Sequence, residues 1–145
     1  MRTSTPVVLL VGDSDCIRAL DQIYRNSGWC VRSASVLSLV PLAMKLIKVD
    51  LIVSDYSLRD GSWRDIRAAM RSLGMDHPIV VVSCLADEHM WAEVLVVGGF
   101  DLMAPPFQPE EVLEMSAHAC GLPGRAIKAL PLPECSPPIL CREPA

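Results

Sequence analysis

Three polar side chains stand where short apolar segments of this sequence end. Asp55 closes the run LIVSD at 51–55, Asp13 follows VVLLV at 7–11, and Ser83 closes PIVVVS at 78–83. Two carboxylates and a hydroxyl offer anionic oxygens and a hydrogen-bond donor, groups that can bind ligands. Each side chain also has a plainer interpretation, because aspartate and serine commonly cap turns and helices. The fold decides between the two interpretations, because only some folds bring the three residues together.

Five apolar segments alternate with five amphipathic ones along the chain. The apolar segments are short and bounded by turn residues, which is typical of strands buried on both faces. The amphipathic segments repeat apolar residues at helical spacing and begin or end at Pro, Ser, Asp or Gly. We expect strands at 7–11, 30–34, 50–55, 78–83 and 100–103, and helices at about 14–28, 38–47, 62–73, 87–98 and 109–121.

This alternation predicts an α/β fold, a flavodoxin-like doubly wound five-stranded parallel sheet with five helices. Parallel neighbours need crossover connections, and right-handed crossovers place helices on both faces of the sheet. The strand order 2-1-3-4-5 suits a chain of this length, and it reverses between strands one and three, where ligands bind. Asp13 and Asp55 should therefore meet there, with Ser83 on the other side of the third strand.

Local signals predict where the helices begin and which faces they bury. Either Asp13 or Ser14 can cap the first helix, and Asp87 the fourth. Ser62-Trp63-Arg64-Asp65 has the spacing of a capping box, in which the serine and the acid bind each other's free amides. The second helix is expected to bury a set of apolar residues at helical spacing, namely Leu39, Leu42, Ala43, Leu46 and Ile47.

The amino-acid composition argues against several classes of function for this chain. The chain has 145 residues, 51% of them hydrophobic, which is enough for one domain with a full core. A net charge of -4, a pI near 5.3 and the lack of a basic stripe argue against nucleic-acid binding. No segment has the length of a membrane span or a signal-peptide core. The sequence also lacks a Cys-x-x-Cys pair, the spacing that would indicate a zinc site. We expect a cytoplasmic protein with a domain at 1–121 and a flexible proline-rich tail or linker at 122–145.

Four segments, in order, carry a family resemblance. They read VLLVGDS at 8–14, LIVSDYSLRDGS at 51–62, PIVVVSC at 78–84 and APPFQPEEV at 104–112. With them the sequence resembles the receiver domain of two-component response regulators, the CheY-like superfamily, over roughly 7–119. In that family the first strand ends in two acids and the central strand ends in the phosphoacceptor aspartate. The fourth strand ends in Ser or Thr, and Lys-Pro-Phe follows the fifth.

The resemblance implies phosphorelay signal transduction and a role for each polar side chain. It makes Asp55 the phosphoacceptor, Asp13 a magnesium ligand, and Ser83 the hydroxyl that contacts the phosphoryl group. The implied cofactor is Mg²⁺, bound by Asp13, Asp55 and the backbone carbonyl of Ser57, since magnesium takes oxygen ligands. The implied partners are a histidine kinase or phosphotransfer protein, a downstream protein and, as a further alternative, a second copy in a homodimer. The chain itself is not expected to be an enzyme.

Five positions depart from the family pattern. Gly12 takes the place of the first acid, which predicts weak magnesium binding, and Pro105 takes the place of the phosphoryl-binding lysine. Arg59 is either a substitute cation or a solvated loop arginine. Leu102 stands where the family often has an aromatic switch residue, and Trp63 where it favours glycine. These changes predict a partly degenerate phosphorylation pocket.

Two other functions stay open. The missing acid and lysine favour a receiver-like module that binds partners without phosphorylation. Its surface would be formed by the helix at 87–98, the strand at 100–103 and the helix at 109–121, where Trp91 and Met90 are either interface anchors or core.

The third hypothesis is a small enzyme on the same fold. The sequence has no glycine-rich phosphate loop, no Gly-x-Ser-x-Gly elbow and no evident Cys-His pair. His77, His89 and His118 are interpreted as surface residues.

Overall fold

A computed structural model describes residues 5–84 and 87–121. Its main sheet is parallel with the order β2-β1-β3-β6-β7, which confirms the predicted flavodoxin-like order 2-1-3-4-5. The strands are β1 (Val7–Val11), β2 (Cys30–Ala34), β3 (Leu51–Asp55), β6 (Ile79–Val82) and β7 (Asp101–Met103). The helices are α1 (Asp15–Asn26), α2 (Val40–Leu46), α3 (Trp63–Ser72), α4 (Glu88–Val97) and α5 (Pro109–Ala119). The predicted tail at 122–145 lies outside the described residues.

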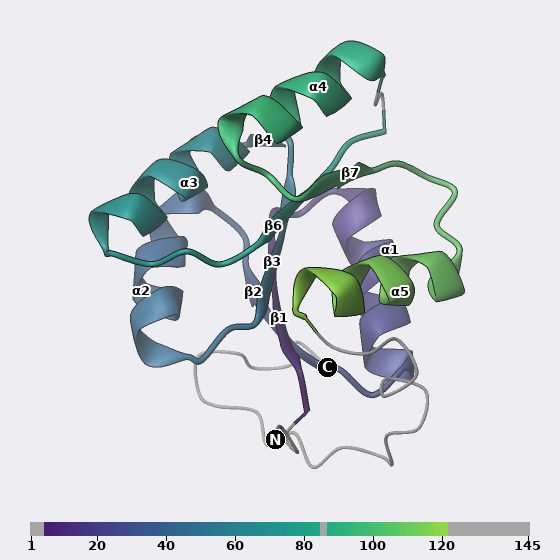
Figure 1. Ribbon diagram of the computed structural model, residues 1–145. Helices are drawn as coiled ribbons and strands as arrows, with labels where there is room; N and C mark the ends of the chain where they lie inside the picture. The colour runs from purple at the N-terminus through teal and green to yellow at the C-terminus, as the bar shows by residue number, and fades with distance from the viewer. Residues whose placement is uncertain (1–4, 85–86, 122–145) are drawn as a thin grey trace.

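Helices cover both faces of the sheet (Figure 1). α1 and α5 pack on one face, where Leu20 and Val112 join the alternate strand residues Leu10 and Val53 in one apolar cluster. α2, α3 and α4 pack on the other face, where Trp63 is one of the largest buried side chains of a second cluster. Successive strand residues point to opposite faces, so a fully apolar strand supplies both clusters.

The predicted caps form. The Ser14 hydroxyl, not Asp13, caps α1 by accepting a hydrogen bond from the Ile17 amide at 3.2 Å. Ser62 and Asp65 form the predicted capping box of α3, and Asp87 caps α4 by accepting from the Met90 amide at 2.8 Å. Each cap satisfies amides that a helix N-terminus leaves unpaired.

The predicted buried face of α2 is wrong for three of its five residues, whereas Ala43 is buried and Ile47 packs against the core as predicted. Leu39, Leu42 and Leu46 are exposed, and α2 buries Val40, Ala43 and Met44. Both stripes are apolar at helical spacing, so periodicity could not choose between them. The chain enters α2 through a short 3₁₀ helix, η1 (Leu37–Leu39), whose first amides bind the Asp60 carboxylate and fix its orientation.

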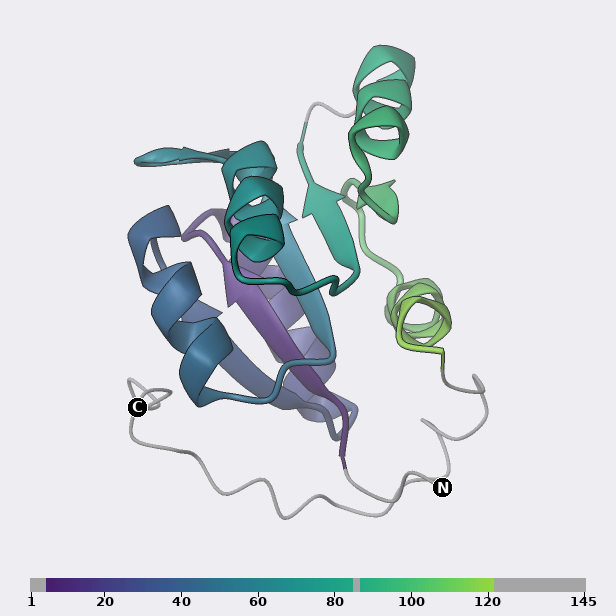
Figure 2. The same ribbon diagram turned by 60° about the vertical axis from the view of Figure 1, so that its left-hand side comes forward.

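A small hairpin that the sequence did not predict follows the central strand. β4 (Ser57–Leu58) pairs antiparallel with β5 (Gly61–Ser62), and the hairpin projects away from the main sheet in Figure 2. Asp60 at its turn accepts hydrogen bonds from the amides of Leu37 and Ser38 at 2.8 and 3.1 Å. These bonds lower the pKa of the Asp60 carboxyl group. The anchored hairpin places Arg59 beside the carboxyl end of β1.

Candidate functional site

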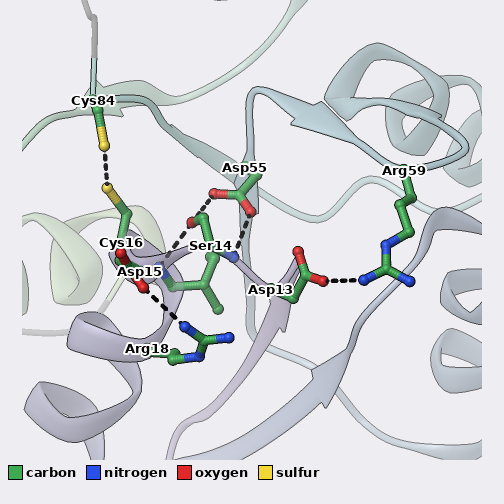
Figure 3. A network of polar contacts seen from close by, with 9 residues as sticks. Asp13, Ser14, Asp15, Cys16, Arg18, Asp55, Arg59 and Cys84 are labelled. Carbon is green, nitrogen blue, oxygen red and sulfur yellow. Dashed lines mark hydrogen bonds and ion pairs between the residues drawn. The ribbon is translucent and has the colours of Figure 1, made fainter.

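Asp55 lies at the carboxyl end of β3, where the strand order reverses. Its residue surface is only 9% exposed. One carboxylate oxygen accepts a 2.6 Å hydrogen bond from the Ser14 hydroxyl, and the other accepts a 3.3 Å bond from the Ser14 amide (Figure 3). Ser14 therefore holds the Asp55 carboxylate with both its side chain and its backbone while it also caps α1.

The electrostatic surroundings of Asp55 disfavour its ionised form. Burial raises the pKa of the Asp55 carboxyl group above its ordinary value, and the hydrogen bonds from Ser14 oppose this shift. The negative charge of Asp13 raises the pKa further. β1 pairs with β3 and Val11 lies opposite Ser54, so Asp13 and Asp55 stand at the ends of adjacent strands, as the predicted switch point required.

Asp13 is engaged by a cation. Its carboxylate lies 2.8 Å from a guanidinium nitrogen of Arg59, which reaches it from the turn of the hairpin (Figure 3). Both side chains are substantially exposed, so water screens this ion pair. Arg59 is thus a solvent-exposed arginine that supplies positive charge to Asp13.

Ser83 follows the strand that pairs with β3, and Ser57 follows Asp55 in the chain. Ser83 directly follows Val82, the residue that pairs in register with Asp55, and its amide donates to the Met103 carbonyl at 3.0 Å. Ser57 begins β4, two residues after Asp55, and pairs with Ser62. The structure thus places all the predicted site residues near the carboxyl end of β3, and their chemical roles stay predictions.

Gly12 has no room for a side chain. Its φ of +123° is one that residues with a side chain rarely adopt, and a Cβ added there would lie 2.2 Å from an Asp55 carboxylate oxygen. The Asp55 carboxylate therefore occupies the space that a side chain at position 12 would need. In this conformation the chain cannot carry the acid that the family pattern has there.

The residues at this site supply oxygen ligands of the kind that a magnesium ion takes. No group of three or more His, Cys, Asp or Glu side chains able to hold a metal occurs within 5–84 and 87–121. Two adjacent carboxylates and the Ser57 carbonyl still suit Mg²⁺, which usually takes one or two carboxylates and completes its shell with water and phosphate. The repulsion between Asp13 and Asp55 also favours a bound cation. Arg59 already neutralises part of that charge.

Sequence reasoning missed three contacts around Asp55. The bond from Ser14 to Asp55 joins residues 41 apart, and the only signal for it was a serine following Asp13. Tyr56 donates its hydroxyl hydrogen to Glu93 of α4 at 2.7 Å, and no sequence pattern indicated this pair. The third contact joins Cys16 and Cys84, whose sulfur atoms lie 3.0 Å apart.

The fold of this chain is similar to that of several solved structures. The chain aligns with the receiver domain of a Francisella response regulator at a TM-score of 0.71, with 19% identity, covering 81% of this chain and 98% of that one. The receiver domain of a sensor histidine kinase from Pseudomonas aeruginosa, solved with magnesium coordinated in its active-site cleft, aligns at 0.70 with 20% identity and covers 81% and 99%. The chain has the receiver-domain fold.

Sequence comparison agrees with the receiver fold. The response regulator protein TodT of Pseudomonas putida is 24% identical over 107 residues, which are 74% of this chain. The match covers 47% of TodT, so the chain spans about half the length of this curated relative. No family model matches the chain. In this fold Asp55 stands at the end of the central strand β3.

Proposed function

We propose that the chain is a receiver module of two-component signalling in which Asp55 accepts a phosphoryl group. The observation that carries this proposal is the position of the Asp55 carboxylate at the carboxyl end of β3, beside a second acid. Ligands bind at this reversal of strand order in open α/β sheets. The similarity to TodT, a response regulator, supports the signalling role.

The proposed reaction transfers a phosphoryl group to Asp55 from a phosphohistidine of a kinase or phosphotransfer protein. An Asp55 oxygen attacks phosphorus in line, the bond from phosphorus to the imidazole nitrogen breaks, and an acyl phosphate forms. Because Ser14 binds both carboxylate oxygens, it can orient one of them while the other attacks. A bound magnesium ion would offset the charge of the phosphoryl group and the two acids.

Two further residues complete the proposed pocket. Ser83, one position beyond the strand residue that pairs with Asp55, would donate its hydroxyl hydrogen to a phosphoryl oxygen. Asp13 would be a magnesium ligand, with Asp55 and the Ser57 carbonyl. Arg59 pairs with Asp13, so the guanidinium and the metal compete for the same carboxylate. This competition, together with the missing acid at Gly12, is consistent with weak metal binding.

Incubation with Mg²⁺ and acetyl phosphate tests the proposal. Intact-protein mass spectrometry should show one added phosphoryl group on the wild type and none on Asp55→Asn. The matched control is Asp15→Asn, which changes a nearby, exposed acid that pairs with Arg18 outside the pocket and should leave phosphorylation intact. A folded wild type that stays unmodified by acetyl phosphate and by phosphohistidine donors would count against Asp55 as phosphoacceptor.

A second candidate function is partner binding without phosphorylation. The lack of space at Gly12 favours it, and so does an exposed apolar surface on α4, where Trp91 is 50% and Val96 85% exposed. Next to this surface lies an open groove between β7 and α5, and Glu111 and Glu114 contribute to its lining. The segment 72–124 contains eight acids and no lysine or arginine. A partner segment with basic and apolar side chains would complement this surface.

A synthetic amphipathic peptide with lysines on one face and leucines on the other tests this second function. Binding to the wild type should weaken about tenfold in Trp91→Ala and in Glu111→Lys, because these changes remove an apolar anchor and reverse a charge. Asp55→Asn should bind like the wild type. If Asp55→Asn weakened binding as strongly as Trp91→Ala, binding would depend on the Asp55 pocket and this function would be wrong.

A further inference from the structure

Two thiols lie in direct contact at the edge of the Asp55 site. The sulfur atoms of Cys16 and Cys84 are 3.0 Å apart, although the residues are 68 positions apart in the chain (Figure 3). Cys16 is in the first turn of α1, two residues after Ser14, and Cys84 directly follows Ser83 at the end of β6. Cys16 is buried and Cys84 is exposed.

Cys120 provides a comparison within the same molecule. In the part of the chain that the structure describes, Cys16, Cys84 and Cys120 are outside any disulfide bond. The Cys120 thiol donates to the backbone carbonyl oxygen of Asp50 at 3.7 Å. A disulfide has a sulfur separation of about 2.05 Å, so the Cys16–Cys84 pair needs an approach of only about 1 Å to form one. Proximity therefore distinguishes this pair from Cys120.

We propose that Cys16 and Cys84 are an oxidation site that forms an intramolecular disulfide when the protein meets a peroxide. The Cys84 sulfur attacks one peroxide oxygen, the O–O bond breaks, and a sulfenic acid forms with release of one water from hydrogen peroxide. The Cys16 sulfur then attacks the Cys84 sulfur, the S–O bond breaks, and a second water leaves. Two thiols and one hydrogen peroxide thus give one disulfide and two waters.

Exposure assigns the order of these two steps. Cys84 reacts first because solvent and peroxide reach it, whereas Cys16 is buried beneath it. Burial, together with contact with Cys84, raises the pKa of the Cys16 thiol to about 12, so Cys16 stays protonated and unreactive toward peroxide in bulk water. Its role is to resolve the sulfenic acid, a step in which contact between the two sulfur atoms offsets its low acidity.

The disulfide would join two segments that carry proposed site residues. On the α1 side Ser14 binds Asp55, and on the β6 side Ser83 precedes Cys84. A bond between them fixes the beginning of α1 to the end of β6 across one side of the site. We expect the disulfide to slow phosphorylation of Asp55, because Ser83 can no longer move toward a phosphoryl group. This expectation rests on the proposed function.

Peptide mapping after hydrogen peroxide treatment tests the oxidation site. Trypsin leaves Cys84 and Cys120 together in the peptide 72–125, so a second protease that cleaves after acidic residues is needed to separate them. The wild type should give a cross-linked peptide containing Cys16 and Cys84. Cys120→Ser should give the same cross-link. Cys84→Ser, an exposed substitution that should not disturb the core, should give none.

Two results would overturn the proposal. One is oxidation of Cys84 to the sulfinic acid without cross-linking while circular dichroism shows the native fold. The other is a cross-link that joins Cys84 to Cys120. Acetyl phosphate labelling of the same samples is a separate readout, in which the oxidised wild type should react at least about tenfold more slowly than the reduced protein and recover with dithiothreitol. A reduced wild type that takes no phosphoryl group argues against the proposed function and leaves the mapping result standing.

Discussion

At the scale of single residues, the burial of Asp55 works against its charge. Its pKa is raised in the folded state, so between pH 3.8, the ordinary value, and the raised value the folded state binds more protons than the unfolded chain. The free energy of unfolding therefore decreases as the pH rises through this window. Asp55 is a residue that lowers stability at neutral pH.

Asp55→Asn should consequently stabilise the fold at neutral pH. The amide can donate to the Ser14 hydroxyl oxygen and accept from the Ser14 amide, which preserves both contacts without the buried charge. Thermal unfolding at neutral pH should give a higher Tm for Asp55→Asn, and the difference should shrink as the pH falls toward 3.8. A lower Tm for the variant at neutral pH would contradict this account.

Gly12→Ala should be strongly destabilising. The substitution forces a side chain into a backbone with φ of +123° and against the Asp55 carboxylate, so we expect a loss of about 2 to 4 kcal/mol in the free energy of unfolding. Gly74→Ala is the matched control, because Gly74 has φ of +72° with nothing within 4 Å of an added Cβ. It should lose only about 1 kcal/mol. Equal losses in urea unfolding would show that the Asp55 contact is unimportant.

The sequence predicted which acids meet, but not how they are held. Asp13 and Asp55 follow from strand order, because the ends of neighbouring parallel strands share one edge. The bonds of Ser14 to Asp55 and of Arg59 to Asp13 depend on side-chain rotamers and on an unpredicted hairpin. Such contacts are decided by packing across distant segments, so local patterns carry no signal for them.

At the scale of elements, one buried polar pair joins α1 to α5. The Ser116 hydroxyl donates its hydrogen to the Val112 carbonyl at 2.6 Å, so Tyr24 must be the donor in its own 2.6 Å bond with Ser116. Both residues are fully buried. Burial raises the pKa of the Tyr24 hydroxyl, which keeps it protonated as this donor role requires.

Removing either partner of the Tyr24–Ser116 pair should lower the free energy of unfolding, but by unequal amounts. Tyr24→Phe leaves Ser116 bound to Val112 and should cost about 1 kcal/mol, whereas Ser116→Ala strands the buried Tyr24 hydroxyl and should cost about 1 to 3 kcal/mol. The double variant should be less destabilised than the sum of the two. Urea unfolding of all four proteins measures this coupling, and strict additivity would rule out the bond as a link between α1 and α5.

The elements themselves were largely predictable. Alternation of apolar and amphipathic segments predicted the five main strands, the five helices and their order, and cap residues located the starts of α1, α3 and α4. The orientation of α2 was not predictable, because two apolar stripes compete on one short helix. The two-residue strands β4 and β5 are too short to have a period.

At the scale of the whole molecule, the charge is unevenly distributed. The acids of 72–124 belong largely to α4, β7 and α5, whereas all but three of the lysines and arginines lie in the first 71 residues. A symmetric dimer through α4 would place this acidic surface against itself, because a two-fold axis pairs each patch with its own copy. Like charges facing each other oppose such a dimer.

Self-association should therefore depend on salt in a specific direction. Sedimentation equilibrium at about 0.01 M salt should show a monomer, and at about 1 M, where charges are screened beyond about 3 Å, any dimer formed by the apolar surface of α4 should increase. Trp91→Ala should remove that increase. A dimer that tightens as the salt concentration falls would instead require complementary charges across its interface.

The three tryptophans differ sharply in their access to solvent. Trp29 and Trp63 are 2% and 0% exposed, while half of Trp91 faces water on α4. Collisional quenching of the intrinsic fluorescence thus samples the α4 surface almost alone, and the native chain carries its own optical reporter of that surface. The negative surroundings should repel iodide, so caesium, a cation, is the better quencher for following occupancy of α4 during titrations.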